Sequence, residues 1–308
     1  MTAMLLCSFA QQYQSINMKV FVTGASGFIG SAIVKELLAA GHEVTGLARS
    51  DESAKAIIDA GAQVIKGDLD DLDSLKRGAS TADGVIHTAF IHDFSQYAKA
   101  AEADKAAIEA MGNALAGSDR PLIVTGGILG LEKENGFITE NIAAPPLPRA
   151  SEATALALAN TGINASVIRL PPSVHDKGDK GFIPFIIDTA RRKNVAAYVG
   201  DGNNRWPAVH RLDAANLFRL ALEKSLKGAR YNAIGDEGIP MRELAEVIGK
   251  CLDLPVESIS PEKAVEHFDW MGRFIVFDAP ATSYKTREQL GWKPTHIGLI
   301  EDMQQHYF

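Results

Sequence analysis

The sequence predicts an α/β fold in which a doubly wound parallel sheet is followed by a smaller C-terminal α+β lobe. Short apolar runs alternate with longer stretches of helical spacing from Met18 to about Leu170, as in repeated strand–helix–strand units. Three glycines separate the first apolar run from the first helical stretch. The 308 residues, 46% of them hydrophobic, suit one large globular domain or two modest ones.

The expected strands and helices follow this alternation in order. Short, largely apolar runs that end at Gly, Pro or a polar turn predict strands at 19–23, 43–47, 63–66, 84–87, 122–125 and 165–169. Helical spacing predicts helices at 29–40, 53–60, 98–116 and 150–159. The prolines within 145–148 mark a loop before the last of these helices.

The pattern changes beyond Pro171, where polar loops, a helix at 182–192 and smaller elements replace the regular alternation. Pro240 and Ser260-Pro261 each begin a further helix. Residues 1–17 precede the first strand and are expected to be an N-terminal extension outside the fold. We therefore expect a second lobe over residues 171–308, with some of its segments returning to the sheet of residues 18–170.

Composition argues against several classes of protein. The chain has 31 basic and 38 acidic side chains, so its net charge of −7 offers no basic surface for nucleic acid or a membrane. No apolar run reaches the ~18 residues of a membrane helix, and the apolar stretch 3–10 lacks the preceding basic residue of a secretion signal. Cys7 and Cys251 are too few and too distant for a disulfide framework. A cytoplasmic protein with a small-molecule partner and no metal is expected.

The glycine-rich turn is the strongest signal, and it reads Thr23-Gly24-Ala25-Ser26-Gly27-Phe28-Ile29-Gly30. In such a turn the first glycine permits the tight bend, the second lets the backbone approach a diphosphate, and the third lets the helix lie against the strand. The N–H groups of the helix start then face the anion. The motif predicts a Rossmann dinucleotide-binding domain over 18–170, with a mainly substrate-binding lobe after it. The expected cofactor contacts here are Gly24, Ser26, Gly27, Phe28, Ile29 and Gly30.

The end of the second strand predicts that NADP(H) is favoured over NAD(H). An acidic residue about 20 positions past the glycines would bind the ribose hydroxyls of NAD, but Ala48 stands there with Arg49 and Ser50 beside it. Arg49 can bind a 2′-phosphate through a charged hydrogen bond worth about 1.5–3 kcal/mol. Asp51 would repel the same phosphate, so NAD(H) stays open as the alternative.

With these features the chain resembles the extended branch of the short-chain dehydrogenase/reductase superfamily, which includes nucleotide-sugar epimerases and dehydratases. The likeness runs from Met18 to about Trp292. Besides the glycine motif it rests on Gly67-Asp68-Leu69, Val85-Ile86-His87-Thr88-Ala89, Val209-His210-Arg211-x-Asp213 and Leu290-Gly291-Trp292-x-Pro294. The resemblance implies that Asp68 and Leu69 flank the adenine, that His87, Thr88 and Ala89 line the middle of the cofactor, and that Pro171 and Val174 reach the nicotinamide. Phe90 and Trp206 are expected at the substrate.

The chain departs from the superfamily at its proton donor, a Tyr in a Tyr-x-x-x-Lys helix. The corresponding residues are Arg149-Ala150-Ser151-Glu152-Ala153, without the Tyr or the Lys, although Thr125 occupies the usual Ser or Thr position. This pattern is similar to an atypical subgroup in which some members are regarded as aldehyde reductases. Loss of a general acid costs about 10²- to 10⁴-fold in rate, so slow reduction remains feasible.

Four residues are therefore candidates for catalysis: Thr125, Arg149, His175 and His210. The Arg149 guanidinium can polarise a carbonyl oxygen but cannot titrate. His175 follows the expected nicotinamide loop, and His210 lies on a segment that borders the substrate pocket in the larger family. With an ordinary pKa of about 6.5, either imidazole can deliver a proton, although structural roles are common for such histidines.

We expect an NADP(H)-dependent reductase of small or medium aldehydes and ketones with a non-standard proton donor. One alternative is a non-enzymatic NAD(P)H sensor that passes the redox state to a partner protein. Another is an epimerase or dehydratase of nucleotide-linked sugars, although that chemistry depends heavily on a Tyr base. Related folds commonly dimerise through two helices, so a homodimer is a further expectation by analogy.

Overall fold

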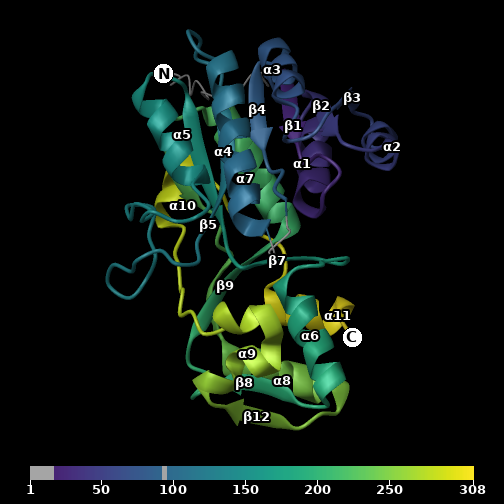
Figure 1. Cartoon of the computed structure of the whole chain (residues 1–308), viewed down its shortest axis with the longest axis vertical. Helices are drawn as coiled ribbons and strands as arrows, with labels where there is room; N and C mark the ends of the chain where they lie inside the picture. The colour runs from purple at the N-terminus through teal and green to yellow at the C-terminus, as the bar shows by residue number, and fades with distance from the viewer. Residues whose placement is uncertain (1–16, 92–95) are drawn as a thin grey trace, which may run out of the picture.

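The computed structural model describes residues 17–91 and 96–308, so all of the expected extension except Asn17 lies outside it. Its centre is a seven-stranded, fully parallel sheet in the order β10-β6-β5-β4-β1-β2-β3 (Figure 1). The strands are β1 Lys19–Thr23, β2 Glu43–Ala48, β3 Gln63–Lys66, β4 Gly84–His87, β5 Leu122–Gly127, β6 Ala165–Leu170 and β10 Arg230–Asn232. This sheet confirms the predicted fold class.

The order of the strands fixes where a ligand can lie. The chain runs outward from β1 through β2 to β3 and then returns to β4 on the other side of β1. The crevice beyond the carboxyl ends of β1 and β4 is thus the point at which the strand order reverses, which is where open parallel sheets bind ligands. The glycine-rich turn leaves β1 at this point.

Helices cover both faces of the sheet. The helices of this domain are α1 Phe28–Ala39, α2 Asp51–Asp59, α3 Leu72–Thr81, α4 Tyr97–Ala114, α5 Ser151–Asn160, α7 Arg211–Lys224 and α10 Tyr284–Leu290. Because strand side chains alternate, Val20 and Val22 pack with α1 and α7, whereas Phe21 faces the core formed with α3, α4 and α5. Two apolar cores therefore hold the sheet rigidly on both sides.

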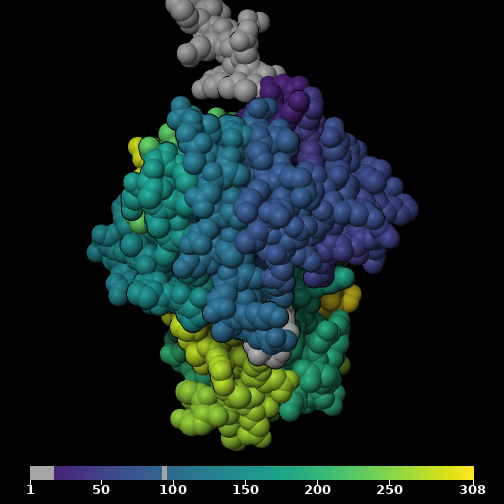
Figure 2. Space-filling model, turned by 45° about the horizontal axis from the view of Figure 1, so that its top comes forward, coloured from purple at the N-terminus to yellow at the C-terminus, as the bar shows by residue number. Residues whose placement is uncertain are grey.

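The second lobe lies at the carboxyl ends of the strands (Figure 1) and forms the narrower lower part of the molecule in Figure 2. Its strands are β7 Ser173–His175, β8 Ala196–Val199, β9 Arg205–His210, β11 Asp236–Pro240 and β12 Val256–Ile259. Its helices are α6 Phe182–Lys193, α8 Met241–Leu252, α9 Ala264–Phe268, α11 Leu299–His306 and the short 3₁₀ turns η2 Pro261–Lys263 and η3 Asp269–Arg273. The largest side chain of its core is Trp206, which is fully buried.

Segments from the second half of the chain return to the main sheet. β10 pairs with β6, with Tyr231 opposite Ile168, and α7 packs along α1. Neither α3 nor α7 is among the helices expected from the sequence. α2 begins at Asp51, two residues earlier than expected, because the Ser50 hydroxyl accepts a hydrogen bond from the Ser53 amide and caps the helix. Within the described residues, no helix combines the length and the apolar content that crossing a membrane requires.

Candidate active site

The glycine-rich turn joins β1 to α1 and packs closely against Thr88 and Ala89, the residues that follow β4. Gly24 has a φ of +71°, which L-residues with a side chain rarely adopt, and a Cβ there would lie 2.7 Å from Thr88 Oγ1 and 2.8 Å from the Ala89 nitrogen. A Cβ on Gly30 would collide with the carbonyl oxygen of Gly24. Both positions therefore require glycine, as the motif predicts.

The start of α1 offers free backbone donors. The first helical hydrogen bond runs from the Ser31 nitrogen to the Gly27 oxygen, so the N–H groups of Phe28, Ile29 and Gly30 have no acceptor within the helix. No side chain caps the helix, and its first turn contains no acidic residue. Ser26 and Gly27 are exposed, which leaves the turn open to an anion. These residues fit the diphosphate of a dinucleotide.

Arg211 connects the second lobe to this turn. Its guanidinium lies 4.6 Å from the centre of the Phe28 ring and donates a 3.4 Å hydrogen bond to the Phe28 carbonyl oxygen. Its Nη2 also forms an ion pair with Asp176 Oδ2 at 2.8 Å. Arg211 belongs to the motif Val209-His210-Arg211-x-Asp213, but the sequence does not reveal this role, because Arg211 and Phe28 are 183 residues apart in the chain.

The end of β2 carries positive charge around the expected 2′-phosphate position. Arg49 is exposed, and its guanidinium makes no ion pair with any residue in the described ranges. Asp51, which could repel a phosphate, is ion-paired with Lys66 of β3 at 2.6 Å. The hydrogen bond and charge of Lys66 hold the pKa of Asp51 below its ordinary value. Lys66 is thus a second cation at this edge that the sequence did not identify.

The expected adenine residues have different environments. Asp68 follows β3 and is exposed, while its Oδ1 accepts hydrogen bonds of 2.9 and 3.0 Å from the amides of Asp70 and Asp71. Its second carboxylate oxygen is left for another partner. Leu69 is buried, and its side chain packs in the apolar core that includes the buried residues of α3.

A buried chain of hydrogen bonds crosses the domain behind the turn. Thr23 Oγ1 lies 2.8 Å from His87 Nδ1, His87 Nε2 lies 3.2 Å from Asp104 Oδ1, and Ser151 Oγ donates a 2.5 Å bond to Asp104 Oδ2. Burial raises the pKa of Asp104, but the hydrogen bonds and charges of His87, Arg149 and Ser151 outweigh this and lower it. His87 is fully buried, so its imidazole does not line the cofactor cleft as expected. Thr88 and Ala89 remain half-buried at the turn.

Arg149, which lies just before α5, extends this series of hydrogen bonds by its bond to Ser151. Its Nε donates a 2.8 Å hydrogen bond to Ser151 Oγ and its Nη2 a 3.2 Å bond to the Thr125 carbonyl oxygen. Its guanidinium carbon lies 4.0 Å from the centre of the Phe90 ring. These contacts, with an ion pair to Asp104 Oδ1 at 3.7 Å, hold a partly exposed cation at the carboxyl ends of β4 and β5.

Thr125 is not placed as a catalytic hydroxyl. Its Oγ1 donates a 2.8 Å hydrogen bond to the His87 carbonyl oxygen, and the residue is buried. The hydroxyl satisfies the backbone between β4 and β5, which corrects the expectation that it would face a substrate. Of the six residues of β5, only the last, Gly127, is exposed.

The two candidate histidines are also held within the protein. His175 is fully buried, and its Nδ1 lies 2.8 Å from Asp302 Oδ2 of α11. His210 caps α7 by accepting a 3.2 Å hydrogen bond from the Leu212 amide, and burial lowers its pKa. The His175 contact lies within the second lobe, whereas His210 joins β9 of that lobe to α7 of the main domain. Neither imidazole is positioned as the expected proton donor. Pro171 is buried and Val174 half-buried on the same segment.

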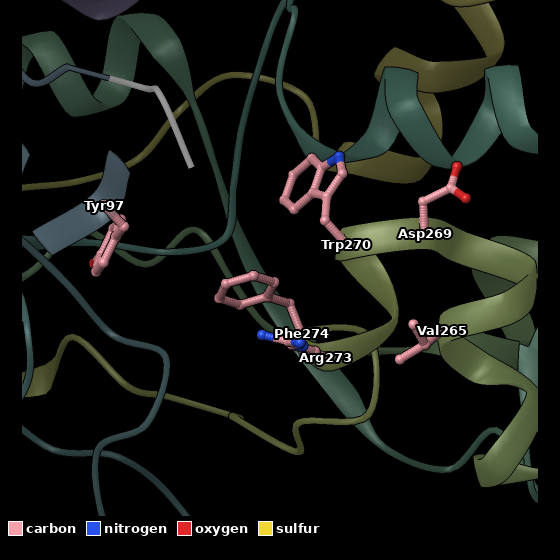
Figure 3. Close-up of a pocket in the computed structure, with 6 residues that line it drawn as sticks. All are labelled: Tyr97, Val265, Asp269, Trp270, Arg273 and Phe274. Carbon is pink, nitrogen blue, oxygen red and sulfur yellow. The ribbon is translucent and has the colours of Figure 1, made fainter. Parts of the chain in front are cut away.

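A cavity of about 590 Å³ lies between α4 and the second lobe. Figure 3 shows Tyr97 on one side and the side chains from α9, η3 and Phe274 on the other. Trp206, an expected substrate contact, is instead fully buried, and its indole N–H donates a 3.2 Å hydrogen bond to the Phe277 carbonyl. Phe90 is half-buried beside Arg149. The residues that line the cavity are Tyr97, Val265, Asp269, Trp270, Arg273 and Phe274.

Comparison with known proteins agrees with this arrangement. A family described as NAD(P)H-binding matches residues 24–199. Two uncharacterized yeast proteins are similar over nearly their whole length: one of Schizosaccharomyces pombe (51% identity, 93% of this chain and 98% of that protein) and one of Saccharomyces cerevisiae (47% identity, 94% and 99%). A 2-alkyl-3-oxoalkanoate reductase of Stenotrophomonas maltophilia is 27% identical over 77% of each chain. The crystal structure of a dTDP-glucose 4,6-dehydratase from Streptomyces venezuelae has the same fold (TM-score 0.75, 21% identity, 94% of this chain and 96% of that one).

Proposed function

Since the chain belongs to the NAD(P)H-binding family, within the epimerase- and dehydratase-like short-chain dehydrogenase/reductase superfamily, we propose that it is an NADP(H)-dependent reductase of aldehydes or ketones. The observation that carries the proposal is the turn at Gly24–Gly30, whose free N–H groups and required glycines fit a dinucleotide diphosphate. When bound, the reduced nicotinamide supplies the hydride that converts a carbonyl to an alcohol.

The protein side chains supply binding and polarisation. Arg211, held against Phe28, adds a positive charge beside the turn that receives the diphosphate. Arg149 lies at the carboxyl ends of β4 and β5, where its N–H groups can hold the developing negative charge of a carbonyl oxygen. The similarity to a 2-alkyl-3-oxoalkanoate reductase supports a carbonyl as the reacting group.

The test mixes the protein with NADPH and a panel of aldehydes and ketones. The loss of nicotinamide absorbance measures the reduction of each carbonyl. We expect turnover of at least one carbonyl class, and we expect Arg149→Met to lower it about 10²-fold, the usual effect of removing one donor that stabilises an oxyanion. Binding of NADPH without turnover of any carbonyl would contradict the reductase and favour a nucleotide sensor.

The preference for NADP(H) rests on the cations at the end of β2 and β3. Arg49→Ala is expected to raise the Kd for NADPH about 10- to 100-fold, because a charged hydrogen bond to phosphate contributes about 1.5–3 kcal/mol, and to leave the Kd for NADH nearly unchanged. Calorimetric titration with both nucleotides measures this. Lys55→Ala on α2, whose ammonium is exposed and paired with Asp59, is the matched control and should change neither constant. Equal weakening of both nucleotides by the Arg49 variant would contradict the assignment.

A further inference from the structure

Tyr97 begins α4 and forms the wall of the cavity of about 590 Å³ on the side of the nucleotide-binding domain. Figure 3 shows the rings of Trp270 and Phe274 projecting toward the side on which Tyr97 lies. Tyr97 is half-buried, so its ring is both supported by the protein and accessible from the cavity.

Tyr97 shares its support with Arg149. The Phe90 ring lies 6.0 Å from the Tyr97 ring, centre to centre, and 4.0 Å from the Arg149 guanidinium carbon. Phe90 lies three residues past His87, the last residue of β4, at the carboxyl ends of the strands. The three side chains therefore form one cluster near the carboxyl end of β4, one of the two strands that border the crevice predicted for a ligand.

The charges around the phenol suit a donor that is protonated at rest. Burial raises the pKa of Tyr97, the Arg149 cation lowers it, and the Asp104 carboxylate raises it, with a net increase. The phenol is therefore neutral at physiological pH. When it loses its proton, the nearby guanidinium stabilises the phenolate, which is the role that a lysine plays beside the tyrosine in the wider superfamily.

We propose that Tyr97 is the catalytic proton donor of the reduction, with Arg149 as its cationic partner, and that the substrate is a carbonyl compound whose aromatic or apolar body lies against Trp270 and Phe274. This inference rests on the proposed function. Trp270 and Phe274 belong to an aromatic cluster with Phe182, whose ring centre lies 5.9 Å from each of theirs. An aromatic wall of this kind buries a flat or apolar group favourably.

The proton balance is simple. The substrate oxygen gains negative charge as the carbonyl carbon accepts the hydride of the reduced nicotinamide nucleotide. Tyr97 then breaks its O–H bond and a new O–H bond forms on the substrate, which leaves an alcohol and a phenolate. The phenolate beside Arg149 regains a proton from water through the cavity. The nucleotide is the only reductant that the step requires.

The decisive experiment compares Tyr97→Phe with Tyr284→Phe, a matched change at a tyrosine that is 73% exposed on α10. With NADPH and 4-nitrobenzaldehyde as the probe, Tyr97→Phe is expected to lower kcat about 10²- to 10⁴-fold, as loss of a general acid does, while the Kd for NADPH stays unchanged. Tyr284→Phe should keep the wild-type rate. A Tyr97→Phe rate within about threefold of wild type would overturn the role of Tyr97 and leave the reductase standing.

A readout without turnover tests the pair itself. The difference in tyrosinate absorbance between wild type and Tyr97→Phe during alkaline titration reports the ionisation of Tyr97 alone. Arg149→Met is expected to move this ionisation to higher pH, because the phenolate loses its cation. Arg191→Met, which removes an exposed cation paired with Asp188, should not move it. An unchanged midpoint in Arg149→Met would overturn the pairing, whereas failure of wild type to reduce any carbonyl would overturn the proposed function instead.

Discussion

Gly27→Asp is expected to weaken binding of NADPH and NADH at least about 100-fold, because the new carboxylate would face the diphosphate across the start of α1, and opposed like charges cost several kcal/mol. The backbone itself accepts the change: Gly27 has φ −73° and ψ 174°, which suit any L-residue, and Asp is a good helix cap. The variant should therefore fold, with a shift of a few tenths of an ångström at the Gly24 carbonyl oxygen, which lies 3.1 Å from the new Cβ. Calorimetric titration and thermal unfolding measure the two effects separately.

A neutral variant separates charge from size. Gly27→Asn has nearly the same volume as the Asp variant, and its Cβ meets the same neighbour, the Gly24 oxygen at 3.1 Å. We expect Gly27→Asn to bind both nucleotides more tightly than Gly27→Asp does. If the Asp variant bound NADPH with wild-type affinity, the assignment of the turn to a diphosphate would be wrong, and the proposed reductase with it.

The second large effect concerns the stability of the fold. Arg169→Met is expected to lower the free energy of unfolding by about 3–5 kcal/mol, because it leaves the Glu152 carboxylate buried without its partner. The two residues are joined by bonds of 2.7 and 2.5 Å, and the Arg169 side chain is fully buried. Arg169 also donates a 3.2 Å bond to the Thr139 carbonyl oxygen, so the loop before α5 should loosen as well.

Urea unfolding provides the measurement and its controls. Adding Glu152→Leu to Arg169→Met should restore part of the lost stability, since the unpaired charge is then gone. Arg191→Met breaks only an exposed pair with Asp188 and should cost at most about 1 kcal/mol. Equal small losses from Arg169→Met and Arg191→Met would show that burial of the ion pair contributes nothing.

Much of the fold could be predicted from the sequence because buried parallel strands are continuous apolar runs. Strands β1, β3 and β4 have the expected bounds. α3 was missed because its ten residues carry only a few apolar side chains, of which Leu75 and Ala79 are buried. α7 was missed because it follows directly on β9, with His210 both ending the strand and capping the helix.

The site was predictable only where its chemistry is local. The glycine turn is a continuous motif, so its residues could be named in advance. The partners of the candidate catalytic residues are distant in the chain. Asp302, which is bonded to His175, is 127 residues away from it, and His87, whose carbonyl oxygen accepts a hydrogen bond from the Thr125 hydroxyl, is 38 residues away from Thr125. Tyr97 begins an alanine-rich helix, where no spacing or motif marks it, and its proposed role follows from the cavity and from Arg149.

The return of β10 and α7 to the main sheet affects how the protein is made. A nascent chain that has left the ribosome only as far as Leu170 carries β1 to β6 and α1, but the apolar surface that α7 and β10 later cover is still bare. The nucleotide-binding half therefore cannot complete its folding during synthesis until Asn232 has emerged. For the same reason, fragments cut after Leu170 would expose this surface and aggregate, and the two lobes are best regarded as one cooperative unit.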